Sequence, residues 1–335
     1  MTSTANQVDR GEADAGPPFV FGFGFKDDTA AEMRWEDVVS HAGEYDFIWL
    51  HLNMLNEEAR EWIAAQRDIP YAAASALLAD ETRPRVTGFE KGLVVNLRGV
   101  NLNEGAEPED MVSIRVWLNE KMMVTTRRRR LKAAQDVRAD INAGASIANT
   151  GALLARIAAK LTDRAEPYVL EIEDEVDNLE EEILTGNGSG LRAKLADTRQ
   201  AAVLFRRFIA PQRDALNRLA ADESALFDHV AKIELREVAD RVTRMTEDID
   251  AARERAMVLQ DQLTDQRAEE MNRNMMVLSV VAAIFLPLGF LTGLFGINVG
   301  GMPGVESASA FWIVVGLCVL IGVGLLAYFR MKKWL

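Results

Sequence analysis

The stretch Gly296-Ile297-Asn298 lies between two long apolar runs and carries groups suited to holding a ligand. The Asn298 amide offers a carbonyl acceptor and N–H donors without fixed charge, so it can hold the water shell of an ion without trapping the ion. Gly296 allows the tight turn that would aim this amide. Taken alone, a helix C-cap at Gly296 and a turn residue at Asn298 form the simpler interpretation.

A second candidate site is a stripe of positions, three and four residues apart, in the apolar run before Gly296. Its members are Asn272, Met275, Leu278, Ala282, Leu286, Gly289 and Gly293. Toward the N-terminus the stripe continues through Ala268 and Thr264 to Asp261. It predicts a mostly apolar conduit with polar ends, which suits a hydrated cation because no cage of carbonyls or carboxylates replaces the bound water. Ordinary packed membrane helices carry small residues too, so small residues alone leave a pore and a packing face open.

Two uncharged runs, 275–295 and 310–329, position these residues. Each is long enough, at about 1.5 Å per residue, to cross a hydrocarbon core of roughly 30 Å. We therefore predict two transmembrane helices joined by an external loop, 296–309, whose only charged residue is Glu306. Basic residues flank the two apolar runs and are absent from the loop between them. Because positive charge beside a membrane helix stays on the cytoplasmic side, we expect a multi-pass inner-membrane protein with both termini in the cytoplasm. The flanking basic residues are Arg267, Arg273, Arg330, Lys332 and Lys333.

The formal net charge of −13 argues against a nucleic-acid partner, which requires clustered cationic side chains. An acidic body could concentrate cations, or it could serve solubility alone, and composition leaves both open. The single cysteine, Cys318, and the widely spaced His41, His51 and His229 do not supply a dedicated Cys/His metal site. The sequence contains no phosphate-binding loop and no nucleophile motif, so it does not indicate an enzyme or a bound cofactor.

The N-terminal part predicts a disordered leader, 1–18, and then a mixed α/β domain, 19–130, with a largely antiparallel sheet. Asn56 is a candidate N-cap, and Asn119-Glu120 links the last two strands. The expected strands are Phe19–Phe25, Asp46–Leu52, Arg85–Glu90, Leu93–Val100, Met111–Leu118 and Lys121–Thr126. The expected helices are Trp35–His41, Glu57–Gln66 and Tyr71–Leu78.

The region 131–222 is predicted to be helical. An acidic helix, Ala148–Leu184, and a basic one, Leu191–Leu219, flank a Gly-rich turn, which suggests an antiparallel pair with ionic contacts. Pro211 is expected to kink or split the second helix. The four arginines 127–130 indicate a solvated strand end or an ion-pairing patch for these acidic helices. A stalk, 223–274, with a helix from about Ser224, is expected to run directly into the first membrane helix.

With Gly296-Ile297-Asn298 followed by Val299-Gly300-Gly301-Met302-Pro303-Gly304 and a second span, the chain resembles the CorA family of divalent-cation transporters. That family has a Gly-Met-Asn signature at the outer mouth, and Ile297 in place of Met is similar to its zinc-transporting ZntB branch. The resemblance implies a funnel-shaped homopentamer: an α/β cytoplasmic domain, a long helical stalk and a two-helix transmembrane hairpin, with the first membrane helices around one axial pore.

Residue by residue, the resemblance places the outer selectivity position at Asn298 and a cytoplasmic acidic ring at Asp261. It makes Asn272, Met275, Leu278, Leu286 and Gly289 pore-lining, and it matches the family's basic tail to Lys332, Lys333 and Trp334. Where some relatives carry an acid after the signature, this chain has Gly300 and Gly304, and Glu306 is the candidate substitute. The transported ion would be zinc, with magnesium, cobalt, nickel and cadmium as alternatives.

Two questions stay open from the sequence. A membrane-tethered coiled-coil scaffold with a regulatory α/β head is the rival interpretation, although the stripe and Asn298 favour a transporter. Proton coupling is the second question, because the apolar runs contain no ionisable residue of the kind that relays protons. Coupling would have to use Glu306, Asp261 or water held in the pore.

Overall fold

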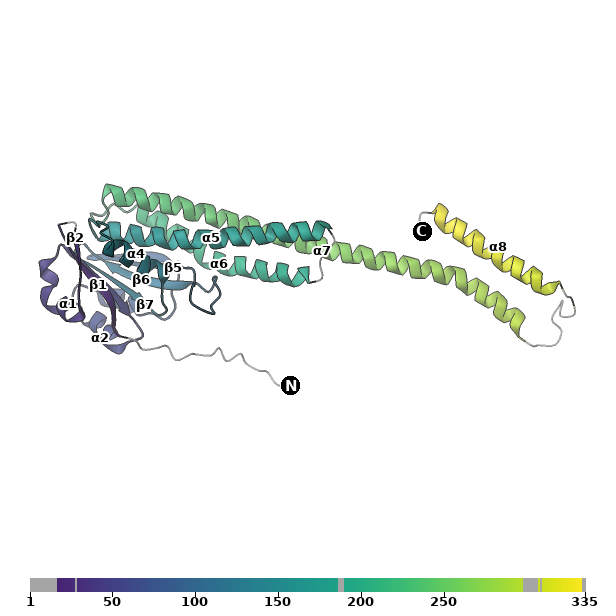
Figure 1. Cartoon of the computed structure of the whole chain (residues 1–335), viewed down its shortest axis with the longest axis horizontal. Helices are drawn as coiled ribbons and strands as arrows, with labels where there is room; N and C mark the ends of the chain where they lie inside the picture. The colour runs from purple at the N-terminus through teal and green to yellow at the C-terminus, as the bar shows by residue number, and fades with distance from the viewer. Residues whose placement is uncertain (1–16, 28, 186–189, 298–306, 308, 333–335) are drawn as a thin grey trace. The chain divides into compact units, whose positions relative to one another are not determined.

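The computed structural model describes residues 17–27, 29–185, 190–297, 307 and 309–332. The chain forms two compact units, one ending at Leu259 and the other beginning at Gln260. Helix α7 (His229–Gly296) contributes to both, so the predicted continuity of the stalk helix with the first membrane helix is confirmed (Figure 1). Leucine and other apolar side chains form the core of the first unit.

A seven-stranded sheet is the centre of the first unit, with strand order β2-β1-β3-β7-β6-β5-β4. Every strand pairing is antiparallel except β3 with β7, as the sequence predicts for a largely antiparallel sheet. The short strand β2 was not predicted, because its four exposed residues carry no alternating pattern. The strands are β1 (Phe19–Lys26), β2 (Thr29–Glu32), β3 (Phe47–Asn53), β4 (Arg85–Phe89), β5 (Gly92–Gly99), β6 (Val112–Leu118) and β7 (Met122–Arg127).

Three short helices, α1 (Trp35–His41), α2 (Glu57–Ala65) and α3 (Tyr71–Leu77), pack on one face of this sheet. Their apolar side chains share a core with alternate residues of the strands, including Leu50, Trp117 and Val124. The side chain of Asn56 accepts a hydrogen bond from the backbone N–H of Glu58 at 2.9 Å, which confirms it as the N-cap of α2.

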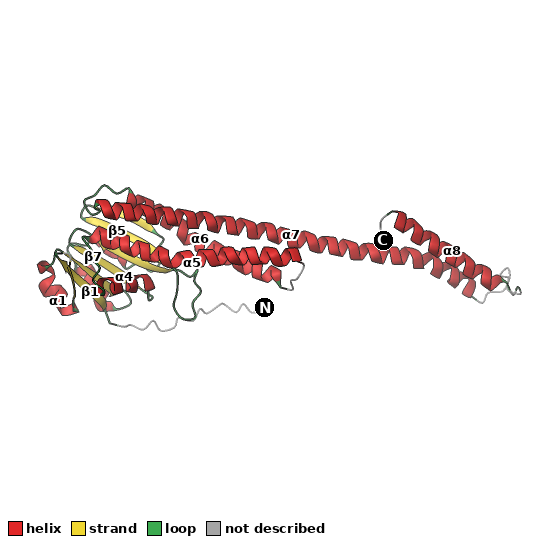
Figure 2. Ribbon diagram, turned by 45° about the horizontal axis from the view of Figure 1, so that its top comes forward, coloured by secondary structure: helices red, strands yellow, loops and turns green. Residues whose placement is uncertain are grey.

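Helix α4 (Lys132–Asn142) packs on the opposite face of the sheet (Figure 2). There the Arg138 guanidinium lies 5.1 Å from the ring centroid of Phe21. Phe21 also stacks on His51 in the sheet interior. The His51 ring lies 2.8 Å from the Thr125 hydroxyl, and burial, with a smaller effect of Arg127, lowers the pKa of His51 to about 3. His51 is therefore a neutral core residue.

Helices α5 (Thr150–Thr185) and α6 (Leu191–Ala220) lie beside the first part of α7 (Figure 1). Asn149 and Asp228 cap α5 and α7, each accepting a hydrogen bond from a backbone N–H three residues on. The two caps also bond to each other, since Asn149 Nδ2 donates to Asp228 Oδ2 at 2.7 Å. The predicted start of the last helix near Ser224 is therefore wrong, because the Asp228 cap places it at His229.

Ionic contacts between α5 and α6 are limited to Lys194 with Glu182 at 3.5 Å, as far as the described residues show. The acids of α5 instead pair with arginines of α7: Arg241 with Asp163 and Glu166, and Arg255 with Asp177 and Glu180. The basic helix α6 joins α7 through Arg206, whose Nη2 lies 3.0 Å from Asp250 Oδ2. The charge pattern thus predicts that these helices form ion pairs. Most of the partners, however, lie on α7 and not on the other helix of the expected α5–α6 pair.

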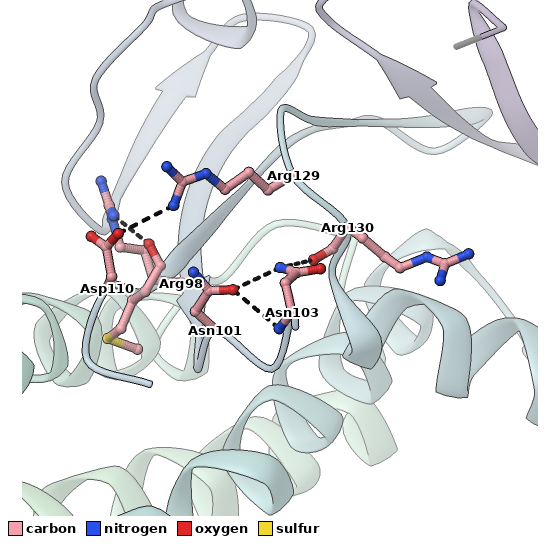
Figure 3. Close-up of polar contacts among 7 residues, drawn as sticks. Arg98, Asn101, Asn103, Asp110, Arg129 and Arg130 are labelled. Carbon is pink, nitrogen blue, oxygen red and sulfur yellow. Dashed lines mark hydrogen bonds and ion pairs between the residues drawn. The ribbon is translucent and has the colours of Figure 1, made fainter. Parts of the chain in front are cut away.

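Two further expectations named alternatives, and the structure excludes one of each. Of a kink or a split at Pro211, the split is excluded, since α6 continues to Ala220 and buries side chains on both sides of the proline. Of a solvated strand end or an ion-pairing patch for the acidic helices, the arginines at the end of β7 match the first, since Arg128 and Arg129 are exposed and, among the described residues, they pair with loop acids and not with those helices. Arg128 pairs with Asp80 at 3.2 Å, and Arg129 pairs with Asp110, also at 3.2 Å (Figure 3).

Candidate functional site

The second unit contains the C-terminal part of α7 and helix α8 (Ala310–Met331), the two described helices long and apolar enough to cross a membrane. One face of α7 meets α8. Val280 on α7 and Phe329 on α8 are 3 % and 7 % exposed, and a Cβ built at Gly322 would lie 3.8 Å from Leu288 Cδ1. We call this face of α7 the seam; its members are Val280, Ile284, Pro287, Leu288 and Leu291, all less exposed than their neighbours.

The predicted stripe lies on the other side of the same helix. At 3.6 residues per turn, its mean direction is about half a turn from the seam. Leu278 and Leu286 are 70 % and 72 % exposed, and Asn272, Met275 and Ala282 are exposed as well. The stripe is therefore the face of α7 that α8 leaves uncovered within one chain.

The small residues at the C-terminal end of the stripe leave open space. A Cβ built at Gly289, Gly293 or Gly296 would meet no heavy atom within 4 Å among the described residues. The hydroxyl of Thr292 is occupied, since it donates to the carbonyl of Leu288 at 2.9 Å. The polar surface here is thus limited.

At the other end of the stripe, Ala268, Thr264 and Asp261 are exposed. The Thr264 hydroxyl donates to the carbonyl of Gln260 at 3.0 Å and so does not offer its proton outward. For Asp261 the described part of the chain shows neither an ion pair nor a hydrogen bond from its side chain. Its carboxylate is available to a cation.

Part of the predicted site lies outside the described residues: Asn298, Glu306, Lys333 and Trp334. Gly296 is the last residue of α7, and Ile297, which follows it, is half exposed. Within the described residues, no three His, Cys, Asp or Glu side chains are grouped so that they could hold a metal ion. Cys318 is half buried on α8.

The sequence reasoning missed the seam, which orients the stripe. The sequence does contain apolar residues at helical spacing there: Val280, Ile284, Leu288 and Leu291. Because every face of a uniformly apolar helix is apolar, this spacing does not identify which face packs against α8. The sequence reasoning also missed that Asn96 on β5 and Arg115 on β6, directly opposite each other in the strand register, are buried polar side chains. There the signal was Asn96, Arg98 and Arg115 within otherwise apolar strands.

The fold and the hairpin define a class of protein: an α/β domain followed by a long helix and a second helix, with two segments long and apolar enough to cross a membrane. The structure of the full-length CmaX protein matches with a TM-score of 0.81 at 32% identity, covering 94% of this chain and 98% of that one.

Residues 44–333 match the family model described as "CorA-like Mg2+ transporter protein", and the chain belongs to this family. It is 32% identical over 312 residues to the zinc transport protein ZntB of Pectobacterium carotovorum, covering 91% of this chain and 95% of the relative. It is 37% identical over 294 residues to the divalent cation transporter CmaX of Pseudomonas aeruginosa, covering 86% and 87%. The chain is thus a transporter of divalent cations rather than an enzyme.

Proposed function

We propose that this chain assembles into a homopentamer in which the stripe of α7 lines an axial pathway for divalent cations, with zinc as the principal ion. The observation that carries the proposal is the position of the stripe about half a turn from the seam. Two helices cannot enclose a path, so the uncovered stripes of several copies must face one another around a symmetry axis. Helix α8 then lies outside α7, toward lipid.

The choice of zinc rests on the ZntB relatives and on Ile297 within the signature. The stripe supports passage of a hydrated ion, because its members from Met275 to Gly289 are apolar or small and have no side-chain oxygen that could replace the water shell. In this proposal a ring of Asn298 amides selects the ion through its bound water at the outer mouth. Glu306 adds negative charge beside it, and a ring of Asp261 carboxylates gathers ions at the inner end.

We further propose that both termini lie in the cytoplasm and that the protein resides in the inner membrane. Arg330 and Lys332 follow the apolar part of α8, and Arg273 precedes that of α7. Positive charge at these ends holds them on the cytoplasmic side.

The direct test is uptake of zinc into proteoliposomes that contain the purified protein and an enclosed zinc-sensitive dye. We expect zinc to enter these vesicles much faster than it enters protein-free vesicles. Adding cadmium, nickel, cobalt or magnesium as a competitor then ranks the preference of the protein among these ions. Repeating the assay with and without an imposed pH gradient tests proton coupling. Vesicles that hold the assembled protein yet take up no divalent cation would support the scaffold interpretation instead.

A further inference from the structure

Each helix of the hairpin has a basic side chain at the end of the seam that lies away from Gly296. On α7, Arg273 precedes Val280 by two helical turns and lies at about 20° from its direction. On α8, Lys332 follows one turn after Phe329 and is the C-cap of the helix. Val280 and Phe329 are the buried apolar side chains of the second unit, as far as the chain is described. The seam therefore ends in one cation from each helix.

The two cations lie at similar levels along the hairpin. The contact between Leu288 and Gly322 sets the level of one helix against the other. Because the two helices are antiparallel, moving back along α7 corresponds to moving forward along α8. By this register the backbones of Arg273 and Lys332 differ by about five residues, which is roughly 7.5 Å along the helix axis. Both side chains are long and flexible, so they can reach one group between them.

The charges of Arg273 and Lys332 are not neutralised within the described part of the chain. Both side chains are exposed, and neither forms an ion pair or a hydrogen bond there. Helix α8 contains no acidic residue. On α7, Glu269 and Glu270 lie one turn before Arg273, farther from the apolar run, and neither is paired with it among the described residues. The two cations therefore leave room for an anionic partner.

The surroundings favour a lipid phosphate over a free anion. The uncharged run begins at Met275, two residues after Arg273, so both cations lie where a hydrocarbon core gives way to lipid headgroups. Rotation about the two helices places Met276 and Tyr328 on the same flank of the seam as Lys332. Their side chains are 41% and 54% exposed. Met276 offers apolar surface to an acyl chain, and tyrosine is typical of the headgroup level.

We propose that Arg273 and Lys332 together bind the phosphate of an acidic phospholipid at this end of the seam. A zwitterionic lipid carries its own ammonium group, which offsets its phosphate, so two unpaired cations favour a lipid with net negative charge. The bound lipid links α7 to α8 beyond their last buried contact and stabilises the hairpin that orients the stripe. This inference requires that the hairpin lie in a membrane, and it is independent of the transported ion and of the number of copies.

The test measures thermal unfolding of the full-length protein in a non-ionic detergent while a ligand is added. The ligands are phosphatidylglycerol, phosphatidylcholine with the same acyl chains, and inorganic phosphate. We expect phosphatidylglycerol to raise the unfolding midpoint by a few degrees and the other two to raise it little, because a ligand that binds the folded state stabilises it. An equal rise with phosphatidylcholine or with inorganic phosphate would overturn the proposal, as would no rise with phosphatidylglycerol.

Substitutions separate this site from general charge attraction. Arg273→Gln and Lys332→Gln should each raise the phosphatidylglycerol concentration at half effect about fivefold. The controls are Arg267, about 120° around α7 from Arg273, and Arg330, about 160° around α8 from Lys332. Arg267→Gln and Arg330→Gln should keep the wild-type lipid dependence. Equal weakening in all four variants would overturn the proposal, because it would show attraction by net charge alone.

Native mass spectrometry of the wild-type protein gives a second readout that does not depend on a variant folding. The protein is incubated with an equimolar mixture of phosphatidylglycerol and phosphatidylcholine, and the lipid that remains bound is identified. Preferential retention of phosphatidylglycerol is the expected result, and equal retention of the two lipids would contradict a site selective for acidic lipid.

Discussion

Leu288 of α7 lies against Gly322 of α8, with 3.8 Å between Leu288 Cδ1 and a Cβ built at the glycine. This contact, together with the buried Val280 and Phe329, sets which face of α7 meets its neighbour in the hairpin. The face that α8 does not cover is consequently the stripe. The small residue at position 322 therefore contributes to orienting the stripe as well as to packing.

Enlarging Gly322 should disturb the hairpin, because a leucine side chain extends well beyond a Cβ that would already be in van der Waals contact with Leu288. We expect Gly322→Leu to lower the unfolding free energy by about 1–3 kcal/mol, as overpacking typically does, and to reduce zinc uptake. Gly324→Leu is the matched control, since a Cβ there would meet no heavy atom of the described residues within 4 Å. Equal effects of the two substitutions on the thermal midpoint and on uptake would show that the seam contact is unimportant.

Much of the fold could be predicted because its patterns are local. Alternating apolar residues predict the strands, and two long uncharged runs predict the membrane helices. The missed features depend on partners distant in sequence. The acids of α5 find their arginines on α7, and Arg129 pairs with Asp110 in a loop.

The candidate site shows the same division. Helical spacing alone groups Leu278, Ala282 and Leu286 on one face, so the stripe is predictable. Which of the apolar faces is covered depends on packing against α8, and only the structure shows that Leu288 lies there. Pro211 is a case in which the local sequence preference is overridden. Proline disfavours a continuous helix, but the packing of Ile209 and Leu216 in the core maintains one.

Glu173 on α5 should make stability depend on pH. Partial burial, and then the charges of Asp248, Asp177 and Asp174, raise its pKa above the ordinary value. A carboxyl with a raised pKa binds its proton more readily in the folded state, so its ionisation costs stability as pH rises through that pKa. We expect Glu173→Gln to raise the thermal midpoint at pH 7, with the gain vanishing as pH falls below about 4.

The control for this prediction is Glu175→Gln, which removes a carboxylate from the same helix. It should change the midpoint little at either pH. A Glu173→Gln protein that is less stable than the wild type at pH 7 would contradict the prediction, because it would make ionised Glu173 a favourable partner of Arg255.

Asp261 should act on cations rather than on folding. A ring of like charges contributes repulsion, so Asp261→Ala should leave the thermal midpoint unchanged or slightly higher while weakening zinc binding measured by calorimetry. Glu270→Ala is the control, since Glu270 is exposed about half a turn around the same helix. Unfolding of the Asp261→Ala protein would instead make Asp261 a structural ion-pair partner.

Asn298 is predicted to select the ion. Asn298→Ala should reduce zinc uptake at least tenfold with the oligomer still assembled, because the amides that hold the hydrated ion are lost. Asn298→Asp should bind zinc more tightly but pass it more slowly, since a ring of carboxylates deepens the well that the ion must leave. Wild-type uptake by an assembled Asn298→Ala protein would return Asn298 to the role of a turn residue.

The most direct test of the ion pathway uses neighbouring alanines that differ mainly in the direction they face. Ala282 is on the stripe, whereas Ala283, also exposed, lies about 100° around the helix. Each is replaced by cysteine in a Cys318→Ala background, and zinc uptake is measured before and after a charged methanethiosulfonate reagent. If the stripe lines the ion pathway, the reagent blocks uptake by the Ala282→Cys protein and spares the Ala283→Cys protein. Block of Ala283→Cys alone, or of neither, would contradict it.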